Sequence, residues 1–165
     1  MAILSDKKIR TLCNTSEPLI ADAPDFEQQL QPAGFDVTVR SIVRMHGNSQ
    51  IGGPYRSKVA AETEMDLREG RYLLDEGPYL VYINEYTRIP LGISATVFPR
   101  STAFRCGCIL QSGLWDSGFC GRGRLGIFVP SGIQVSIEHN APIAQLVFLE
   151  SPDIETPFQF NQFYR

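Results

Sequence analysis

The chain has 165 residues, of which 43% are hydrophobic and 20% are charged, and its formal net charge is -3. This length fits a single domain, residues 1–165, whose core needs no disulfide or metal for stability. The negative charge argues against a nucleic-acid polymer as the main partner. No stretch reaches the roughly 18 apolar residues of a membrane span, so we expect no membrane partner and a cytoplasmic location.

The cysteines exclude one class of nucleotide enzyme. They are Cys13, Cys106, Cys108 and Cys120, and they form no CxxC pair. The HxE and PCxxC signature of the zinc-dependent nucleobase deaminases is therefore absent. We expect buried free thiols, with Cys106 and Cys108 on one face of a strand.

The first predicted element is a helix within residues 1–16. Ser5 is a good N-cap, and Leu4 and Ile9 stand at the two positions of a hydrophobic staple. Asn14 is expected to end the helix.

From residue 35 the hydrophobic pattern changes to period two. Phe35, Val37 and Val39 alternate with polar residues, which predicts a strand with one buried face. Glycine- and proline-containing turns separate the later strand candidates, as in an all-β sandwich or barrel. These candidates are residues 79–83, 93–98, 106–110, 124–129, 133–137 and 143–149. We interpret residues 151–165 as a tail that docks on the rest of the domain. It is a candidate to cover a site.

The segment 99–105, PRSTAFR, is a candidate anion site. Ser101 is expected to cap a short helical turn whose free N–H groups point outward, flanked by Arg100 and Arg105. Guanidinium groups suit phosphate oxygens. The alternative is an ordinary capped turn with surface ion pairs.

The segment 112–121, SGLWDSGFCG, predicts a hairpin with a tightly shaped tip. Its main chain can present N–H and C=O groups to the edge of a base, with Asp116 placed to polarise a water. The alternative is an aspartate that stabilises its own turn.

Two polar residues fall within strand patterns. Asp36 follows Gly34 and Phe35, and a carboxylate there can hold the waters of a magnesium ion. The alternative is a solvated charge. Gln145 interrupts an apolar strand, and a buried amide needs partners, which are either structural or phosphate.

The order of these segments is more specific than any one of them. PAGFD, PRSTAFR, GLWDSGFCG and PIAQLVF, in this order, resemble the motifs of the dUTPase and dCTP deaminase superfamily. The opening ILSDKKI, followed by QPAGFDV, is similar to the deaminase branch in particular. The resemblance runs from about residue 3 to about 163. It implies a distorted jelly-roll-like β-barrel with a short N-terminal helix, and a homotrimer with active sites between subunits.

The resemblance also implies roles for individual residues. Asp116 matches the aspartate that positions the hydrolytic water, and Asp36 matches the carboxylate associated with Mg²⁺. Phe119 matches the aromatic residue that packs on the deoxyribose, and uracil is expected against the hairpin backbone. The phosphate-binding residues are Arg100, Ser101, Thr102, Arg105 and Gln145, and the base- and sugar-binding residues are Gly113, Leu114, Trp115 and Phe119.

One position separates the two chemistries of the superfamily. Members that deaminate resemble each other in carrying a glutamate ten residues after the hairpin aspartate, and here that position is Gly126. Glycine cannot act as an acid or base, so the resemblance favours hydrolysis of dUTP to dUMP and pyrophosphate. The alternatives are a dCTP deaminase, a bifunctional enzyme, and a non-catalytic nucleotide-binding regulator.

The sequence departs from the family pattern at three places. Ser117 stands where the deaminase-like branch usually has proline. Arg122 and Arg124 add positive charge beside the hairpin, and they either extend the phosphate site or balance the acidic surface. The tail lacks the glycine-rich lid of the classical dUTPases, and Phe160 and Phe163 are candidates to cover the substrate.

Overall fold

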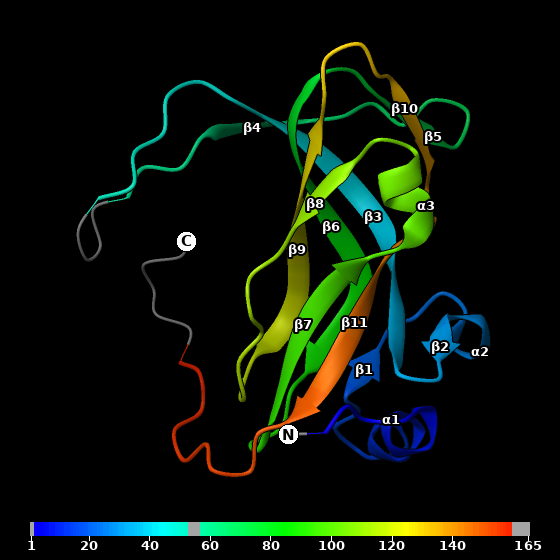
Figure 1. Cartoon of the computed structure of the whole chain (residues 1–165), viewed down its shortest axis with the longest axis vertical. Coiled ribbons are helices and arrows are strands. Elements are labelled where there is room, and N and C mark those ends of the chain that lie inside the picture. The colour runs from blue at the N-terminus through cyan, green and yellow to red at the C-terminus, as the bar shows by residue number, and fades with distance from the viewer. Residues whose placement is uncertain (1, 53–56, 160–165) are drawn as a thin grey trace.

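The computed structural model describes residues 2–52 and 57–159, and the chain folds mainly into β-strands (Figure 1). The helices are Asp6–Cys13 (α1), Phe26–Gln29 (α2) and Ser101–Arg105 (α3). The strands are Ile20–Ala21 (β1), Leu30–Gln31 (β2), Gly34–His46 (β3), Ala61–Glu64 (β4), Arg71–Leu74 (β5), Gly77–Arg88 (β6), Ile93–Pro99 (β7), Ile109–Gln111 (β8), Cys120–Val129 (β9), Val135–Glu138 (β10) and Pro142–Glu150 (β11). Strands make up 49% of the structure and helices 11%, which confirms the all-β prediction.

The main sheet runs in the order β7-β11-β3-β6-β9-β8 and curls into a nearly closed barrel. The two ends of this order meet where Ala95 of β7 pairs with Trp115, in the loop after β8. Two backbone hydrogen bonds of 2.8 Å join these residues. The predicted jelly-roll-like barrel is therefore confirmed, and its closure depends on the segment that carries Asp116.

The barrel interior follows from alternation along the strands. On β6, Tyr79, Val81 and Ile83 are buried, while the residues between them are partly exposed. Successive side chains of a strand point to opposite faces, so one face fills the core.

The N-terminal helix forms as the local sequence predicts, although it is shorter than residues 1–16. It spans Asp6–Cys13, and the Ser5 side chain accepts a hydrogen bond from the Lys8 N–H at 3.4 Å. Leu4 and Ile9 are both buried, as expected of a hydrophobic staple.

Some local predictions were wrong. The strand expected at 106–110 begins only at Ile109, because α3 extends to Arg105 and Cys106 closes its last turn. Cys106 and Cys120 are exposed rather than buried, whereas Cys108 is buried. The sequence patterns also missed β4, whose four residues are all exposed, and the four-residue strand β5, which pairs with β10. Strands this polar or short carry little periodic signal.

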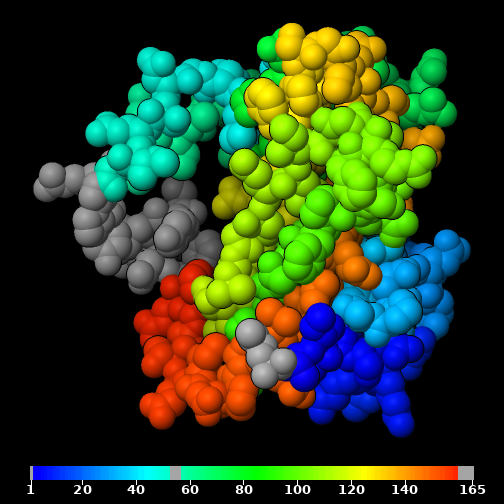
Figure 2. All heavy atoms as spheres, in the orientation of Figure 1, coloured from blue at the N-terminus to red at the C-terminus, as the bar shows by residue number. Residues whose placement is uncertain are grey.

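The tail leaves β11 and passes beneath the loop that joins β8 to β9 (Figures 1 and 2). The Phe158 N–H donates to the Ser117 carbonyl at 2.6 Å, and Pro157 lies against Gly118. The expected docking of the tail on the body is thus observed up to residue 159. Phe160 and Phe163 lie outside the described residues. In the part of the chain that is described, no helix is long and apolar enough to cross a membrane.

Candidate active site

The cationic segment predicted at 99–105 forms the helix α3, directly after β7. Arg100, not Ser101, occupies the N-cap position, and its side chain makes no cap hydrogen bond. Ser101, Thr102 and Arg105 are exposed, while Ala103 is buried and anchors the turn. Because the polar side chains of α3 make no capping hydrogen bonds, they remain available to bind an anion.

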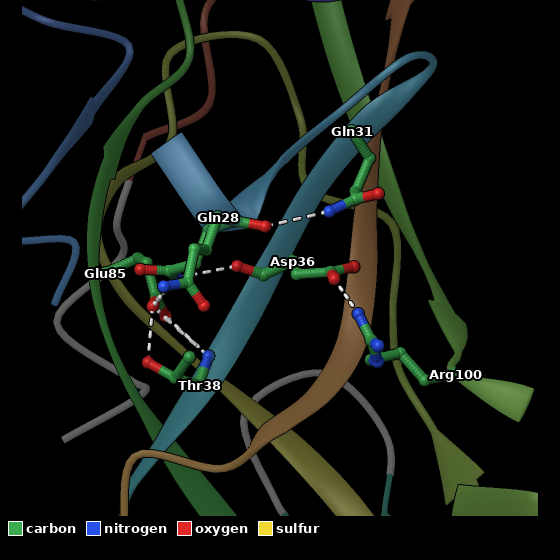
Figure 3. Close-up of polar contacts among 7 residues, drawn as sticks. Gln28, Gln31, Asp36, Thr38, Glu85 and Arg100 are labelled. Carbon is green, nitrogen blue, oxygen red and sulfur yellow. Dashed lines mark hydrogen bonds and ion pairs between the residues drawn. The ribbon is translucent and has the colours of Figure 1, made fainter. Parts of the chain in front are cut away.

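Arg100 forms an ion pair with Asp36, which lies on β3, one strand beyond β11 in the sheet (Figure 3). Asp36 is buried, with 3% of its surface exposed, so it is neither a solvated charge nor a bare carboxylate. A buried carboxylate of this kind needs an opposite charge, and Arg100 supplies it. The pair therefore fixes the arginine at the start of α3.

Gln145 belongs to the same group of residues because β11 lies between β3 and β7. It is paired in register with Asp36 on one side and with Phe98 on the other. Its side chain lies against Gly34, where a Cβ would approach the Gln145 Cγ to 3.0 Å. The glycine thus leaves room for the amide. A hollow of about 370 Å³ opens beside Asp36 and Arg100.

Asp116 lies in the loop 112–119 between β8 and β9, hereafter the aspartate loop, and its side chain is exposed. The residues on either side of it are both tied to β7. Trp115 pairs with Ala95 through its backbone, and the Ser117 Oγ donates to the Ile93 carbonyl at 2.5 Å. The turn is closed by the Asp116 carbonyl, which accepts from the Phe119 N–H at 3.0 Å. Its carboxylate makes no hydrogen bond within the described residues, so it is not used to stabilise its own turn.

The aromatic residues of the aspartate loop have different settings. Trp115 is buried, and its ring covers Gly123 so closely that any side chain there would overlap it. Phe119 is half-buried between Trp115 and Phe158, with ring centroids at 5.2 and 6.4 Å. It also lines a hollow of about 500 Å³. Phe119 is therefore accessible to a ligand, whereas the Trp115 ring is a structural part of the loop.

The backbone of the aspartate loop is only partly free to read a base. Both the N–H and the C=O of Trp115 are bonded to Ala95. Gly113 and Leu114, which precede it, are exposed. The main-chain groups of Gly113 and Leu114 are thus more open to a ligand than those of Trp115, although the Gly113 C=O accepts from the Ser112 hydroxyl at 3.0 Å.

The fold separates Asp116 from α3 within one chain. The aspartate loop contacts β7 near its start, at Ala95, whereas Arg100 follows the end of that strand (Figure 1). An extended strand rises about 3.3 Å per residue, so the segment from 95 to 100 spans roughly 16 Å. Arg100 and the aspartate loop therefore lie at opposite ends of β7.

The extra arginines of β9 are engaged elsewhere. Arg122 forms an ion pair with Asp22 at 2.5 Å, and its guanidinium lies 5.8 Å from the centre of the Tyr86 ring. Arg124 lies 5.7 Å from the centre of the Tyr82 ring. These contacts favour the interpretation of local charge balance and packing over an extension of the phosphate site.

Sequence reasoning missed Glu85, which lies fully buried on β6 and holds the backbone near Asp36. It accepts hydrogen bonds from Gln29 and from Thr38 (Figure 3). Burial raises the pKa of Glu85, and the hydrogen bonds from Thr38 and Gln29 oppose that rise. The alternation of Val81 and Ile83 places residue 85 on the same buried face, and this signal was available.

The described residues contain no group of three histidine, cysteine, aspartate or glutamate side chains able to hold a metal ion by themselves. Magnesium commonly keeps several waters and binds through one or two carboxylates together with substrate phosphates. The exposed Asp116 and the Asp36–Arg100 pair are compatible with a metal of that kind.

Comparison with solved structures identifies the class of fold. The structure is similar to a 2'-deoxycytidine 5'-triphosphate deaminase from Agrobacterium tumefaciens, with a TM-score of 0.68 and 22% identity. That match covers 88% of this chain but only 46% of the deaminase. It is also similar to the native dUTPase of EIAV, with a TM-score of 0.51 and 14% identity over 87% of this chain and 97% of that one. At these identities the likeness concerns the fold alone.

The sequence settles the family. The dCTP deaminase-like family model matches residues 3–151, and the chain belongs to this family. A probable deoxyuridine 5'-triphosphate nucleotidohydrolase of Archaeoglobus fulgidus is 38% identical over 150 residues, which cover 90% of this chain and 88% of that protein. The deoxyuridine 5'-triphosphate nucleotidohydrolase of Methanocaldococcus jannaschii is 30% identical over 138 residues, covering 81% and 86%.

Proposed function

We propose that this protein hydrolyses dUTP to dUMP and pyrophosphate. The observation that carries the proposal is an exposed carboxylate, Asp116, in a loop that β7 clamps on both sides. Relatives named deoxyuridine 5'-triphosphate nucleotidohydrolases match most of the chain and support the same activity.

In this proposal each part of the site has one task. Uracil lies against the main chain of Gly113 and Leu114, and Phe119 packs on the deoxyribose, where a 2'-hydroxyl would not fit. Asp116 orients a water and accepts its proton as the water attacks the α-phosphorus. Catalysis then rests mainly on positioning and on neutralising the charge that develops on the phosphates.

The phosphates are bound by the segment at the end of β7 and by the adjacent strand. Arg100, with its orientation set by Asp36, offers a guanidinium fork to phosphate oxygens. The hydroxyls of Ser101 and Thr102, the Arg105 guanidinium and the Gln145 amide complete the cradle.

We propose Mg²⁺ as the cofactor, entering with the triphosphate. When bound, magnesium acts as a Lewis acid that withdraws charge from the phosphate oxygens. Asp36 remains the candidate for holding its waters, and its pairing with Arg100 limits it to that indirect role. The protein's own residues supply the water activation, the cradle and the nucleoside contacts.

We further propose that the site is completed between copies of the chain in a homotrimer. Ala95, where the aspartate loop pairs with β7, and Arg100 are separated by roughly 16 Å of extended strand, which favours a triphosphate bound between two copies over one bound by both segments of a single chain. Large apolar side chains are also exposed on β7, α3 and β8 and suit burial against a second copy. They are Phe98, Phe104 and Ile109.

A second candidate is deamination of dCTP, which the family model favours by its name. The position of the deaminating glutamate is Gly126, which has no ionisable group. A Cβ would fit there, since on Gly126 it meets the Gln111 Cβ at an ordinary 3.5 Å. The missing acid is therefore a property of this sequence, not a demand of its packing, and it favours hydrolysis.

The test is a set of parallel assays with dUTP, dCTP, dTTP and UTP in magnesium buffer, measuring pyrophosphate and ammonia. Pyrophosphate from dUTP alone, without ammonia from dCTP, is the expected result. Ammonia release from dCTP would establish a deaminase. Binding of dUTP with no turnover, unchanged by Asp116→Asn, would establish a non-catalytic nucleotide-binding regulator.

A further inference from the structure

Glu85 is a fully buried carboxylate that the proposed reaction does not use. Burying a carboxylate is costly unless hydrogen bonds replace its water shell. Here they do: Gln29 Nε2 donates to it at 2.6 Å, the Thr38 hydroxyl at 2.6 Å and the Thr38 N–H at 3.0 Å. Because burying this carboxylate costs free energy, we expect Glu85 to hold a part of the fold in place.

Every recorded partner side chain of Glu85 is a donor. The Thr38 hydroxyl also accepts from the Asn84 amide at 2.9 Å, so its own proton is free to point at Glu85. The site therefore requires a group that only accepts. A glutamine has nearly the same shape, but with its oxygen in the place of the Glu85 Oε1 its NH₂ group would face the Thr38 N–H, which donates to Oε2.

Glu85 stands where two strands separate. The register between β3 and β6 ends at Val39 and Ile83, and just beyond it the Thr38 N–H donates to the Glu85 carboxylate. The carboxylate thus ties β3 to β6 two residues away from Asp36.

The same network holds Asp36 from a second side. Gln29 Nε2, which donates to Glu85, also donates to the Asp36 carbonyl at 2.8 Å. The Asp36 backbone is fixed by these contacts, while its side chain reaches across to Arg100 (Figure 3). A chain of direct contacts therefore runs from Glu85 to the guanidinium at the start of α3.

We propose that Glu85 is a positioning residue for the phosphate cradle: it fixes Asp36, and through Asp36 it sets the direction of Arg100. The effect on nucleotides rests on the proposed function. Glu85 touches no substrate. Its replacement weakens binding of the triphosphate end of the nucleotide and leaves binding of the uracil end unchanged.

The experiment compares two dissociation constants for each variant, one for the non-hydrolysable α,β-imido-dUTP and one for dUMP. Glu85→Gln is expected to raise the ratio of the first to the second by about fivefold or more, because an interaction with a charged group is misdirected. Tyr79→Phe is the matched control. Tyr79 lies on the same strand as Glu85 but away from Asp36. The substitution removes the hydrogen bond that the Tyr79 hydroxyl donates to the Asp75 carbonyl. It is expected to leave the ratio unchanged.

A second pair of variants covers the case in which Glu85→Gln does not fold. Thr38→Val removes the hydroxyl that donates to Glu85, and Thr38→Ser keeps it. The proposal expects a raised ratio for the valine variant and a normal ratio for the serine variant. Equal ratios in both, or a normal ratio in folded Glu85→Gln, overturn it.

Failure of the proposed function is distinguishable from failure of this inference. If the unaltered protein neither binds nor splits dUTP, the function is wrong. The positioning role is then tested by the chemical shifts of the Arg100 side-chain NMR signals. These are compared between the unaltered protein and Glu85→Gln, under conditions in which the guanidinium protons exchange slowly with water. A changed Arg100 signal in Glu85→Gln and an unchanged one in Tyr79→Phe support the role, and an unchanged signal in both refutes it.

Discussion

Gly123 on β9 offers a sharp test of how the aspartate loop is held. A Cβ on this residue would overlap the Trp115 ring, with three ring atoms no further away than 3.0 Å. Trp115 is buried and its backbone closes the barrel against Ala95, so the ring has little room to withdraw. Gly123→Ala therefore forces the loop away from β7. Gly126→Ala is the matched control, since its Cβ meets Gln111 at 3.5 Å.

The expected cost follows from the overlap. Inserting a methyl group into a packed core usually costs about 1–3 kcal/mol, and the rigid indole places Gly123→Ala near the upper end. For a chain of this size, about 2–3 kcal/mol lowers the Tm by roughly 5–10 °C. The control is expected to stay within about 2 °C of the unaltered protein.

Thermal unfolding and fluorescence measure this directly. The chain has one tryptophan, so its emission reports on Trp115 alone. Gly123→Ala is expected to melt earlier and to shift the emission to longer wavelength as the ring becomes exposed. Equal melting temperatures for the two alanine variants, with unchanged emission, would refute the packing described for the loop.

Three further results are expected. Asp116→Asn lowers kcat for dUTP by about a hundredfold or more while dUTP still binds, as pre-steady-state binding would show. Arg100→Lys keeps the charge but loses the guanidinium fork, and it raises KM for dUTP about tenfold in steady-state assays. Thiol titration at pH 8 modifies the exposed Cys106 and Cys120 first. Burial raises the pKa of Cys13 and of Cys108, so their thiolates form only at higher pH and they react later; equal rates at all four cysteines would contradict this order.

Local signals in the sequence predicted the elements that depend on neighbours along the chain. The cap at Ser5 and the staple of Leu4 and Ile9 define α1, because helix ends are stabilised by residues three or four positions away. Alternating hydrophobic residues predicted β3, because one buried face imposes period two. The predicted N-cap of α3, Ser101, was wrong. The backbone is still extended at Arg100, so Arg100 is the N-cap and Ser101 is the first residue of the helix.

The parts that depend on the strand order were beyond a single sequence. Asp36 meets Arg100 only because β11 lies between β3 and β7, and no local pattern reports that arrangement. The distance between Asp116 and the cradle likewise follows from where the aspartate loop pairs with β7. The alternation on β6 could have predicted that Glu85 is buried. It could not have predicted which residues donate hydrogen bonds to Glu85.

In the proposed trimer, Asp116 of one copy acts on a triphosphate bound by α3 of another copy. The most direct measurement mixes two inactive variants, Asp116→Asn and Arg100→Gln, under conditions that let subunits exchange. If the site is shared in a trimer, random mixing in equal amounts restores about a quarter of the dUTP hydrolysis of the unaltered protein. If subunits exchange and no activity returns, the two groups do not meet across copies, and the account of the site is wrong.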